Sequence, residues 1–277
     1  MDETSGLAGY RNDFPGLLFD TPATHVLRVT INNPGRLNAL DHALHRQVER
    51  IWQAIDSDPA VRCSIITGAG RAFCAGGATD AMGAETDTLA GDWMARDFGS
   101  ALGLVDALID AKKPIVSAIN GVAVGAGLAI ALLADVPIAA AEAKLFDGHP
   151  RVGVVAGDHA ALIWPLLCGI AKSKYFLLTN EPMTGEQAER NNLVALAVPS
   201  EQLAAKAVEV AARIAAGAPT AIRMTKYVLN HWLRQQRPIF DLSAALEMIC
   251  YGNGEAAEAI RALAEKRAGH FPREPFF

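Results

Sequence analysis

The order of strand-like and helical segments is the feature that most limits what this chain can fold into. In the first half, strand-like runs at residues 25–33 and 62–70 lie on either side of a segment, 43–55, whose apolar residues recur at helical spacing. Two further strand-like runs, 113–120 and 136–143, are separated by a short helix that begins after a glycine-rich turn. This alternation predicts an α/β core.

The pattern becomes helical after about residue 158, and few strand-like runs interrupt it. Helices in such a terminal region add little to a parallel sheet, so we expect them to pack over the functional site or against other subunits. We therefore divide the chain into an α/β core, residues 1–200, and a helical extension, residues 201–277, that serves oligomerisation and covers the active site.

Composition favours work on small molecules. The chain has 277 residues, of which 51% are hydrophobic, and its 25 Lys and Arg are outnumbered by 30 Asp and Glu, so nucleic acids and anionic membranes are not expected partners. Residues 115–134 lack charge, but they are rich in Ala and Gly and contain Asn120, which argues against a membrane span. The scattered cysteines and the absence of a signal-like N-terminus predict reduced thiols and a cytoplasmic protein.

Two glycine-rich turns, residues 70–80 and 119–130, each follow a predicted strand. Glycine lets backbone N–H groups approach a ligand closely. Neither turn fits the dinucleotide or P-loop patterns, so phosphate binding by those routes has little support. The two turns could instead converge on one carbonyl oxygen and form an oxyanion hole, which stabilises the negative charge of an enolate or tetrahedral species. The alternative is a pair of tight turns that serve packing alone.

Five motifs occur in order along nearly the whole chain. They are NNPGRLNAL, GRAFCAGG, INGVAVGAG, LTNEPMTGEQAERNNLVALAVP and EAIRALAEKRAGHF. Together they resemble the motifs of the crotonase (enoyl-CoA hydratase/isomerase) superfamily. This resemblance implies a crotonase-like α/β spiral of β-β-α units with a helical C-terminal trimerisation region, assembled as a homotrimer or as a hexamer made of two trimers.

The resemblance also implies site residues. The backbone N–H groups of Gly77 and Ala126 correspond to the oxyanion donors, with Ala126 in place of a more usual glycine. The two glutamates with which the family's hydratases deliver water correspond to Ala129 and His149, so both are missing. Histidine titrates near neutral pH and is a plausible replacement base. Simple hydration of a short enoyl-CoA by two glutamates is therefore expected to be poor.

His149 is followed nine residues later by Asp158, at the start of a predicted helix. Asp158 could orient His149 as in a catalytic pair, or could cap the helix. The spacing is similar to that of the superfamily's carbon–carbon hydrolases of cyclic β-diketones, typified by 6-oxocamphor hydrolase. Glu247 lies near a glutamate used in that branch, or else is a solvated helix residue. His159 is expected to be a packing or solvent-facing residue.

Two basic residues favour coenzyme A as part of the substrate. We expect no separately bound cofactor and no metal. Arg36 and Lys266 match family positions near the nucleotide and phosphate groups, although each alone could be a solvated surface residue. The leading hypothesis is an acyl-CoA enzyme with an oxyanion-stabilised enolate and a His149–Asp158 pair. The alternatives are a coenzyme-A-independent retro-Claisen hydrolase of a cyclic β-diketone and an inactive scaffold.

Overall fold

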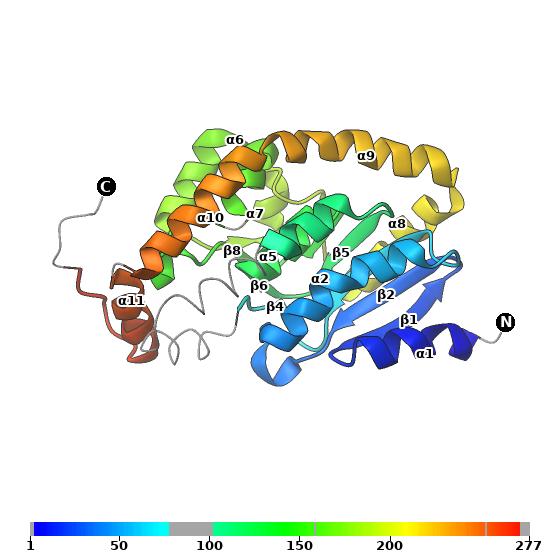
Figure 1. Cartoon of the computed structure of the whole chain (residues 1–277), viewed down its shortest axis with the longest axis horizontal. Helices are drawn as coiled ribbons and strands as arrows, with labels where there is room; N and C mark the ends of the chain where they lie inside the picture. Colours follow the sequence, from blue (N-terminus) through cyan, green and yellow to red (C-terminus); the bar gives the residue numbers. More distant parts are fainter. Residues whose placement is uncertain (1–2, 78–101, 158, 253, 272–277) are drawn as a thin grey trace.

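A computed structural model (Figure 1) describes residues 3–77, 102–157, 159–252 and 254–271. Its largest sheet has six strands in the order β1-β2-β3-β5-β7-β10. β1 and β2 are antiparallel, and every other neighbouring pair in this sheet is parallel. The strands predicted at 25–33, 62–70, 113–120 and 136–143 are confirmed as β2, β3, β5 and β7. The bounds are β1 Leu17–Ala23, β2 Val26–Ile31, β3 Cys63–Gly68, β5 Ile115–Ile119, β7 Val136–Ala140 and β10 Leu196–Val198.

A second sheet has four short strands in the order β4-β6-β8-β9. Each of β4, β6 and β8 follows a strand of the larger sheet, namely β3, β5 and β7, so the chain repeats a pair of one long and one short strand. This repetition confirms the predicted α/β spiral. The turns within these pairs place the two glycine-rich segments at the small sheet. The bounds are β4 Ala72–Cys74, β6 Val122–Val124, β8 Lys144–Phe146 and β9 Met183–Thr184.

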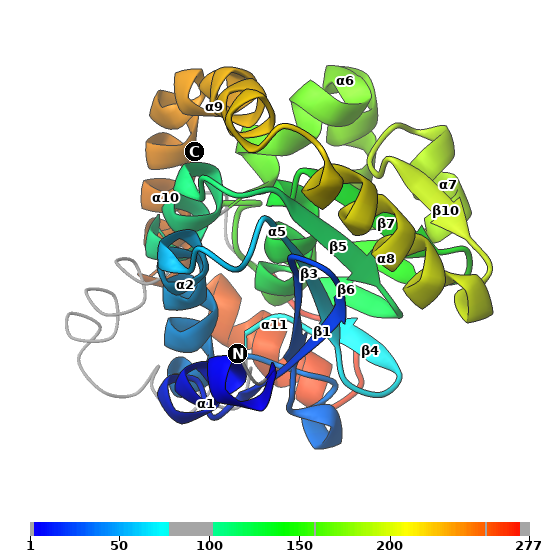
Figure 2. The same cartoon turned by 90° about the vertical axis from the view of Figure 1, so that its right-hand side faces the viewer.

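Helices cover the sheets and form most of the described chain after residue 159. α9 and α10 follow one another around one side of the molecule, and α8 packs against β3 and β5 of the larger sheet (Figure 2). The helix predicted at 43–55 is confirmed as α2. The bounds are α1 Glu3–Asp13, α2 His42–Ser57, α5 Ala126–Leu133, α6 Ala160–Thr179, α7 Gly185–Arg190, α8 Ser200–Ala216, α9 Pro219–Gln235, α10 Arg237–Gly252 and α11 Glu255–Ala264, with 3-10 turns η1 Pro34–Arg36 and η2 Pro150–Val152.

Helix ends follow from local sequence. The Asp41 side chain accepts a hydrogen bond from the Leu44 N–H at the start of α2. α7 begins with a capping box, in which Thr184 and Gln187 each accept a hydrogen bond from the other's backbone N–H. These polar contacts satisfy N–H groups that have no partner within the helix.

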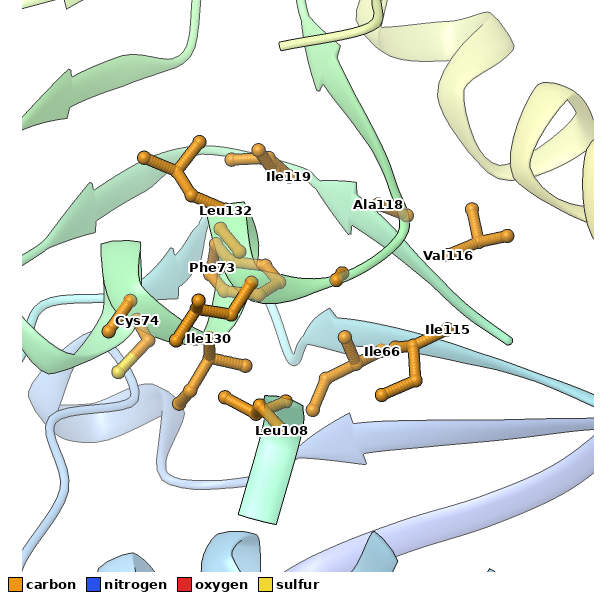
Figure 3. Close-up of a cluster of buried hydrophobic side chains, with 14 of the residues drawn as sticks. Ile66, Phe73, Cys74, Leu108, Ile115, Val116, Ala118, Ile119, Ile130 and Leu132 are labelled. Carbon is orange, nitrogen blue, oxygen red and sulfur yellow. The ribbon is translucent and has the colours of Figure 1, made fainter. Parts of the chain in front are cut away.

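The core lies between the two sheets and α5. Figure 3 shows Ile66 of β3, Phe73 of β4, Ile119 of β5 and Ile130 of α5 in one apolar cluster. Residues 127–133 of α5 are all buried, so this helix is apolar on every face. Residues 115–134 therefore form β5, β6 and α5, which confirms that this uncharged segment does not form one membrane-spanning helix.

The helical pattern after residue 158 begins with α6, in which two helical segments follow one another. Its backbone is non-helical at Gly169, with φ 75° and ψ 159°, so the element is kinked there. Among the described residues, α6 alone is long and apolar enough to cross a membrane by length and composition. It packs against α5 and α10, and 28% of its apolar stretch is buried in the structure.

Candidate active site

The second glycine-rich turn presents a backbone N–H at the start of α5. Gly125 precedes the helix with φ 49° and ψ −123°, a conformation open to glycine, and Ala126 is the first helical residue. The first N–H groups of a helix have no acceptor within it and carry partial positive charge. The helical backbone of Ala126 has a negative φ, so alanine fits this position without backbone strain.

The first glycine-rich turn lies directly against the second. A Cβ built on Gly76, whose φ is 88°, would lie 2.8 Å from the Val124 carbonyl oxygen and 3.9 Å from the Ala126 nitrogen. Gly76 accepts a hydrogen bond from the Leu40 N–H at 2.8 Å, and Gly77 pairs with Leu40 in an isolated bridge. The two turns therefore approach each other closely, as the prediction of converging N–H groups requires.

Cys74 is fully buried beneath these turns. Burial raises the pKa of its thiol to about 12, because a thiolate would lose its hydration there. A Cβ on Gly127 would overlap the Cys74 carbonyl oxygen, so glycine at 127 lets α5 pack against β4. Cys74 thus packs as a neutral side chain, and its raised pKa argues against a nucleophilic role.

His149 lies between β8 and η2, next to the second turn. Its Nδ1 lies 3.0 Å from Oδ1 of Asp147, and its backbone N–H donates to Oδ2 of the same carboxylate at 3.2 Å. The Asp147 side chain is fully buried, while that of His149 keeps 12% of its surface exposed. A Cβ on Gly125 would lie 3.9 Å from the His149 ring, so this imidazole is adjacent to the residue that precedes Ala126.

Glu247 of α10 reaches the other side of the imidazole. Its Oε1 lies 3.6 Å from His149 Nε2, and its side chain is only 10% exposed. The Ser243 hydroxyl donates to the Gly157 carbonyl at 3.1 Å and ties α10 to the loop before α6. The alternative of a solvated Glu247 is therefore wrong, because the side chain is buried beside the proposed base.

The remaining predicted site residues lie in different settings. Asp158 lies outside the described residues. His159 is fully buried at the start of α6, in agreement with a packing role. Ala129, which stands where a hydratase glutamate is expected, is also fully buried, and its methyl group cannot transfer a proton. Within the described part of the chain, no group of three or more His, Cys, Asp or Glu could hold a metal ion.

Both predicted coenzyme A contacts are exposed. Arg36 ends η1, and Lys266 follows α11 with a left-handed φ of 53°. Asn38 holds the loop that carries Arg36. Its buried side-chain amide donates to the carbonyls of Ala69 and Ala72 at 2.8 Å. The NNPGRLNAL motif therefore anchors its basic residue next to the first glycine-rich turn.

Asp147 is the site residue that the sequence reasoning missed. The spacing predicts Asp158, nine residues after His149, as its partner, whereas the aspartate two residues before His149 makes the contact with Nδ1 in the described structure. A D-x-H pattern directly after a short strand is the signal that could have found it. Because the turn after β8 folds back, this spacing brings the carboxylate to Nδ1.

The chain is similar to known proteins along most of its length. A family model described as enoyl-CoA hydratase/isomerase matches residues 22–274. The chain is 32% identical to the (E)-benzylidenesuccinyl-CoA hydratase of Thauera aromatica, over 90% of this chain and 96% of that protein. It is 29% identical to the 1,2-epoxyphenylacetyl-CoA isomerase of Escherichia coli, over 89% and 94%. A crystal structure of an enoyl-CoA hydratase/isomerase from Mycobacterium paratuberculosis has a TM-score of 0.81 and 30% identity, over 91% and 98%.

Proposed function

Because the chain belongs to the enoyl-CoA hydratase/isomerase family, we propose that it binds an acyl-CoA thioester and stabilises the enolate of that thioester at the N–H groups of Gly77 and Ala126. The close approach of the two glycine-rich turns is the observation that carries this proposal. N–H groups already aimed at the position of the oxygen need no reorganisation as negative charge develops there.

His149 is the proposed acid–base group. Its Nε2 removes a proton from the carbon next to the thioester carbonyl, and the two electrons of that C–H bond become the enolate. The same nitrogen can return the proton to another carbon or activate a water molecule. Glu247, at 3.6 Å, stabilises the imidazolium that forms. Asp158 remains part of this proposal as a second orienting group.

Coenzyme A recognition is proposed for Arg36 and Lys266, whose exposed side chains suit charge-assisted contacts with phosphate. Two relatives named for acyl-CoA activities, a hydratase and an isomerase, support a thioester substrate. No separately bound cofactor is needed, because coenzyme A enters as part of the substrate.

A second candidate is a retro-Claisen hydrolase of a cyclic β-diketone that needs no coenzyme A. The position of Glu247 beside His149 favours it, because the β-diketone hydrolase branch that the chain resembles uses a C-terminal glutamate. In this reaction His149 removes a proton from water, the hydroxide adds to a ketone carbon, and the oxyanion turns hold the charge. Collapse of the adduct breaks the carbon–carbon bond and leaves an enolate that is protonated.

We further propose a cytoplasmic homotrimer or dimer of trimers, with the helical extension at the interface. α9 supports this because it presents large apolar side chains that no described part of the chain covers, and such patches mark interaction surfaces. Light scattering after size exclusion measures the assembled mass, and a monomer would contradict the proposal. The exposed apolar residues of α9 are Met224, Tyr227, Val228, Leu229 and Trp232.

Calorimetric titration with coenzyme A and with a short acyl-CoA separates the two candidate reactions. Saturable binding that weakens in Arg36→Ala and Lys266→Ala supports the thioester. Arg213→Ala removes an exposed charge from α8 and is the control that should bind like the parent protein. No binding at millimolar ligand would contradict a thioester substrate, and cyclic β-diketones would then be the first compounds to test.

A further inference from the structure

We propose that Asp147 is the positioning residue that fixes the tautomer of His149, holding the proton on Nδ1 and leaving the Nε2 lone pair to act as the base. This inference rests on the proposed function for its catalytic meaning. Its structural content, the tautomer itself, can be tested without any substrate.

The contacts of the Asp147 carboxylate support this role. Oδ1 lies 3.0 Å from His149 Nδ1, and Oδ2 accepts the backbone N–H of His149 at 3.2 Å. Both oxygens are therefore engaged by the same residue, which limits rotation of the carboxylate and of the imidazole together. An ionised carboxylate can only accept hydrogen bonds, so the hydrogen of the neutral ring is favoured on Nδ1, which lies at hydrogen-bond distance from Asp147. Nε2 lies 3.6 Å from Glu247 Oε1, which is beyond that distance, so this second carboxylate competes less strongly for the hydrogen.

Burial strengthens this constraint. The Asp147 side chain has no exposed surface, so water cannot replace the imidazole as its partner from the solvent side. If Nδ1 carried no hydrogen, Oδ1 of this buried carboxylate would face a lone pair in place of a donor, which is unfavourable for an ionised group out of contact with water. The arrangement with Nδ1–H toward Asp147 is thus strongly preferred, and Nε2 is left facing Glu247.

The backbone of Asp147 links the base to the oxyanion turn. Its carbonyl oxygen accepts the Gly125 N–H at 2.9 Å, and Gly125 directly precedes Ala126. One residue therefore holds the imidazole through its side chain and the second turn through its main chain. This connection sets the position of Nε2 relative to the Ala126 N–H, the two groups that must act on the same substrate.

Ring nitrogen resonances of 15N-labelled histidine, read in the full-length protein, test the tautomer. His149→Gln identifies the signal of His149 among the seven histidines. In the parent protein, at a pH where the ring is neutral, we expect Nδ1 to carry the hydrogen. In Asp147→Asn the amide can donate to Nδ1, so we expect the hydrogen to move to Nε2.

Two further variants make the test specific. Asp158→Asn should keep the parent tautomer, because Asp147 fixes the hydrogen on Nδ1 and any contribution of Asp158 is to the orientation of the ring. Asp135→Asn removes another partly buried carboxylate, which pairs with Lys226, and controls for general destabilisation. Once a substrate is known, Asp147→Asn should lower kcat about 10²-fold or more with a smaller change in KM.

Three results would overturn the inference. The first is an Nε2–H tautomer in the parent protein, which decides the matter even if Asp147→Asn fails to fold. The second is an unchanged tautomer in a folded Asp147→Asn. The third is a tautomer that changes in Asp158→Asn instead. If the tautomer behaves as expected and no acyl-CoA binds or reacts, the proposed function fails and the role of Asp147 in holding His149 stands.

Discussion

His149 Nε2 and Glu247 Oε1 lie 3.6 Å apart, although His149 follows a strand of the small sheet and Glu247 lies on α10 near the end of the chain. The helical extension therefore contributes an acidic side chain to the site that also contains the two glycine-rich turns. Proper packing of α10 is a condition for a complete site within one chain.

Gly157→Ala tests that condition from the opposing loop. A Cβ on Gly157 would overlap the Glu247 carboxylate, so we expect the glutamate to be displaced from His149. Turnover should fall about 10²-fold, close to the effect of Glu247→Gln. Gly252→Ala is the matched control on α10, because its new methyl group meets no atom within 4 Å. Equal activity of Gly157→Ala and Gly252→Ala would show that the position of Glu247 does not matter.

Ala126→Pro removes the proposed oxyanion donor and little else. Proline is favoured at the first position of a helix, which is where Ala126 lies. The residue before a proline prefers an extended backbone, and Gly125, with φ 49° and ψ −123°, adopts the mirror image of such a backbone. We expect kcat to fall about 10²- to 10³-fold with the thermal unfolding midpoint nearly unchanged.

The control for this substitution is Ser200→Pro, at the first position of α8 after Pro199 with φ −51° and ψ 143°. It introduces proline in an equally compatible setting away from the glycine-rich turns, and activity should be retained. A fully active Ala126→Pro enzyme would contradict the role of that N–H group.

Much of the fold could be predicted because it depends on local patterns. β2, β3, β5 and β7 are runs of apolar and β-branched residues, and α2 has a regular apolar face. β4, β6 and β8 have three residues each, too few to show a period of two, and β9 is shorter still. They exist because neighbouring strands pair with them, which is a tertiary effect.

The site residues also divide into those that local sequence patterns predict and those that depend on tertiary packing. The turns around Gly77 and Ala126 follow from glycine patterns, and His149 from its place in a motif. The contact of Glu247 with His149 depends on how α10 docks, which helical periodicity does not specify. The contact between Asp147 and His149 could have been predicted from their D-x-H spacing. The spacing of His149 and Asp158 instead resembles that of a catalytic pair, so Asp158 is the predicted partner.

Lys226 is expected to hold α9 against the larger sheet. Its buried ammonium group donates to Asp135 at 2.7 Å and to the Lys113 carbonyl at 3.0 Å, and Asp135 also accepts the Ile115 N–H. Lys226→Met leaves that carboxylate without its countercharge, so we expect the free energy of unfolding to fall by about 2 kcal/mol. Denaturant unfolding measures it. Lys174→Met replaces an exposed lysine on α6 and should change the free energy of unfolding little. An equal loss of unfolding free energy in the two variants would contradict the role of Lys226 in holding α9.

Stability should fall at alkaline pH through two buried thiols. Burial raises the pKa of Cys63 and of Cys74 from 9.0 to about 12 in the folded protein. Their contribution to stability is therefore complete below pH 9 and is lost as the pH rises toward 12, by about 1 kcal/mol per thiol between pH 8 and pH 10.

The measurement compares denaturant unfolding at those two pH values in the parent protein and in Cys74→Ala. Between pH 8 and pH 10, the fall in the free energy of unfolding that the two thiols cause should be about half as large in Cys74→Ala as in the parent protein. This expectation does not depend on how stable the variant is at pH 8. An identical pH dependence in the two proteins would show that Cys74 does not titrate on unfolding.

Hydrogen exchange at the α-carbon of a short acyl-CoA in deuterated buffer tests the central claim most directly, because the exchange requires both the enolate and the base. Mass spectrometry of the recovered acyl-CoA gives the rate. We predict exchange by the parent protein, slowed about 10²-fold or more by His149→Gln and by Ala126→Pro. Exchange that continues unchanged in His149→Gln, or no exchange by parent protein saturated with the acyl-CoA, would contradict it.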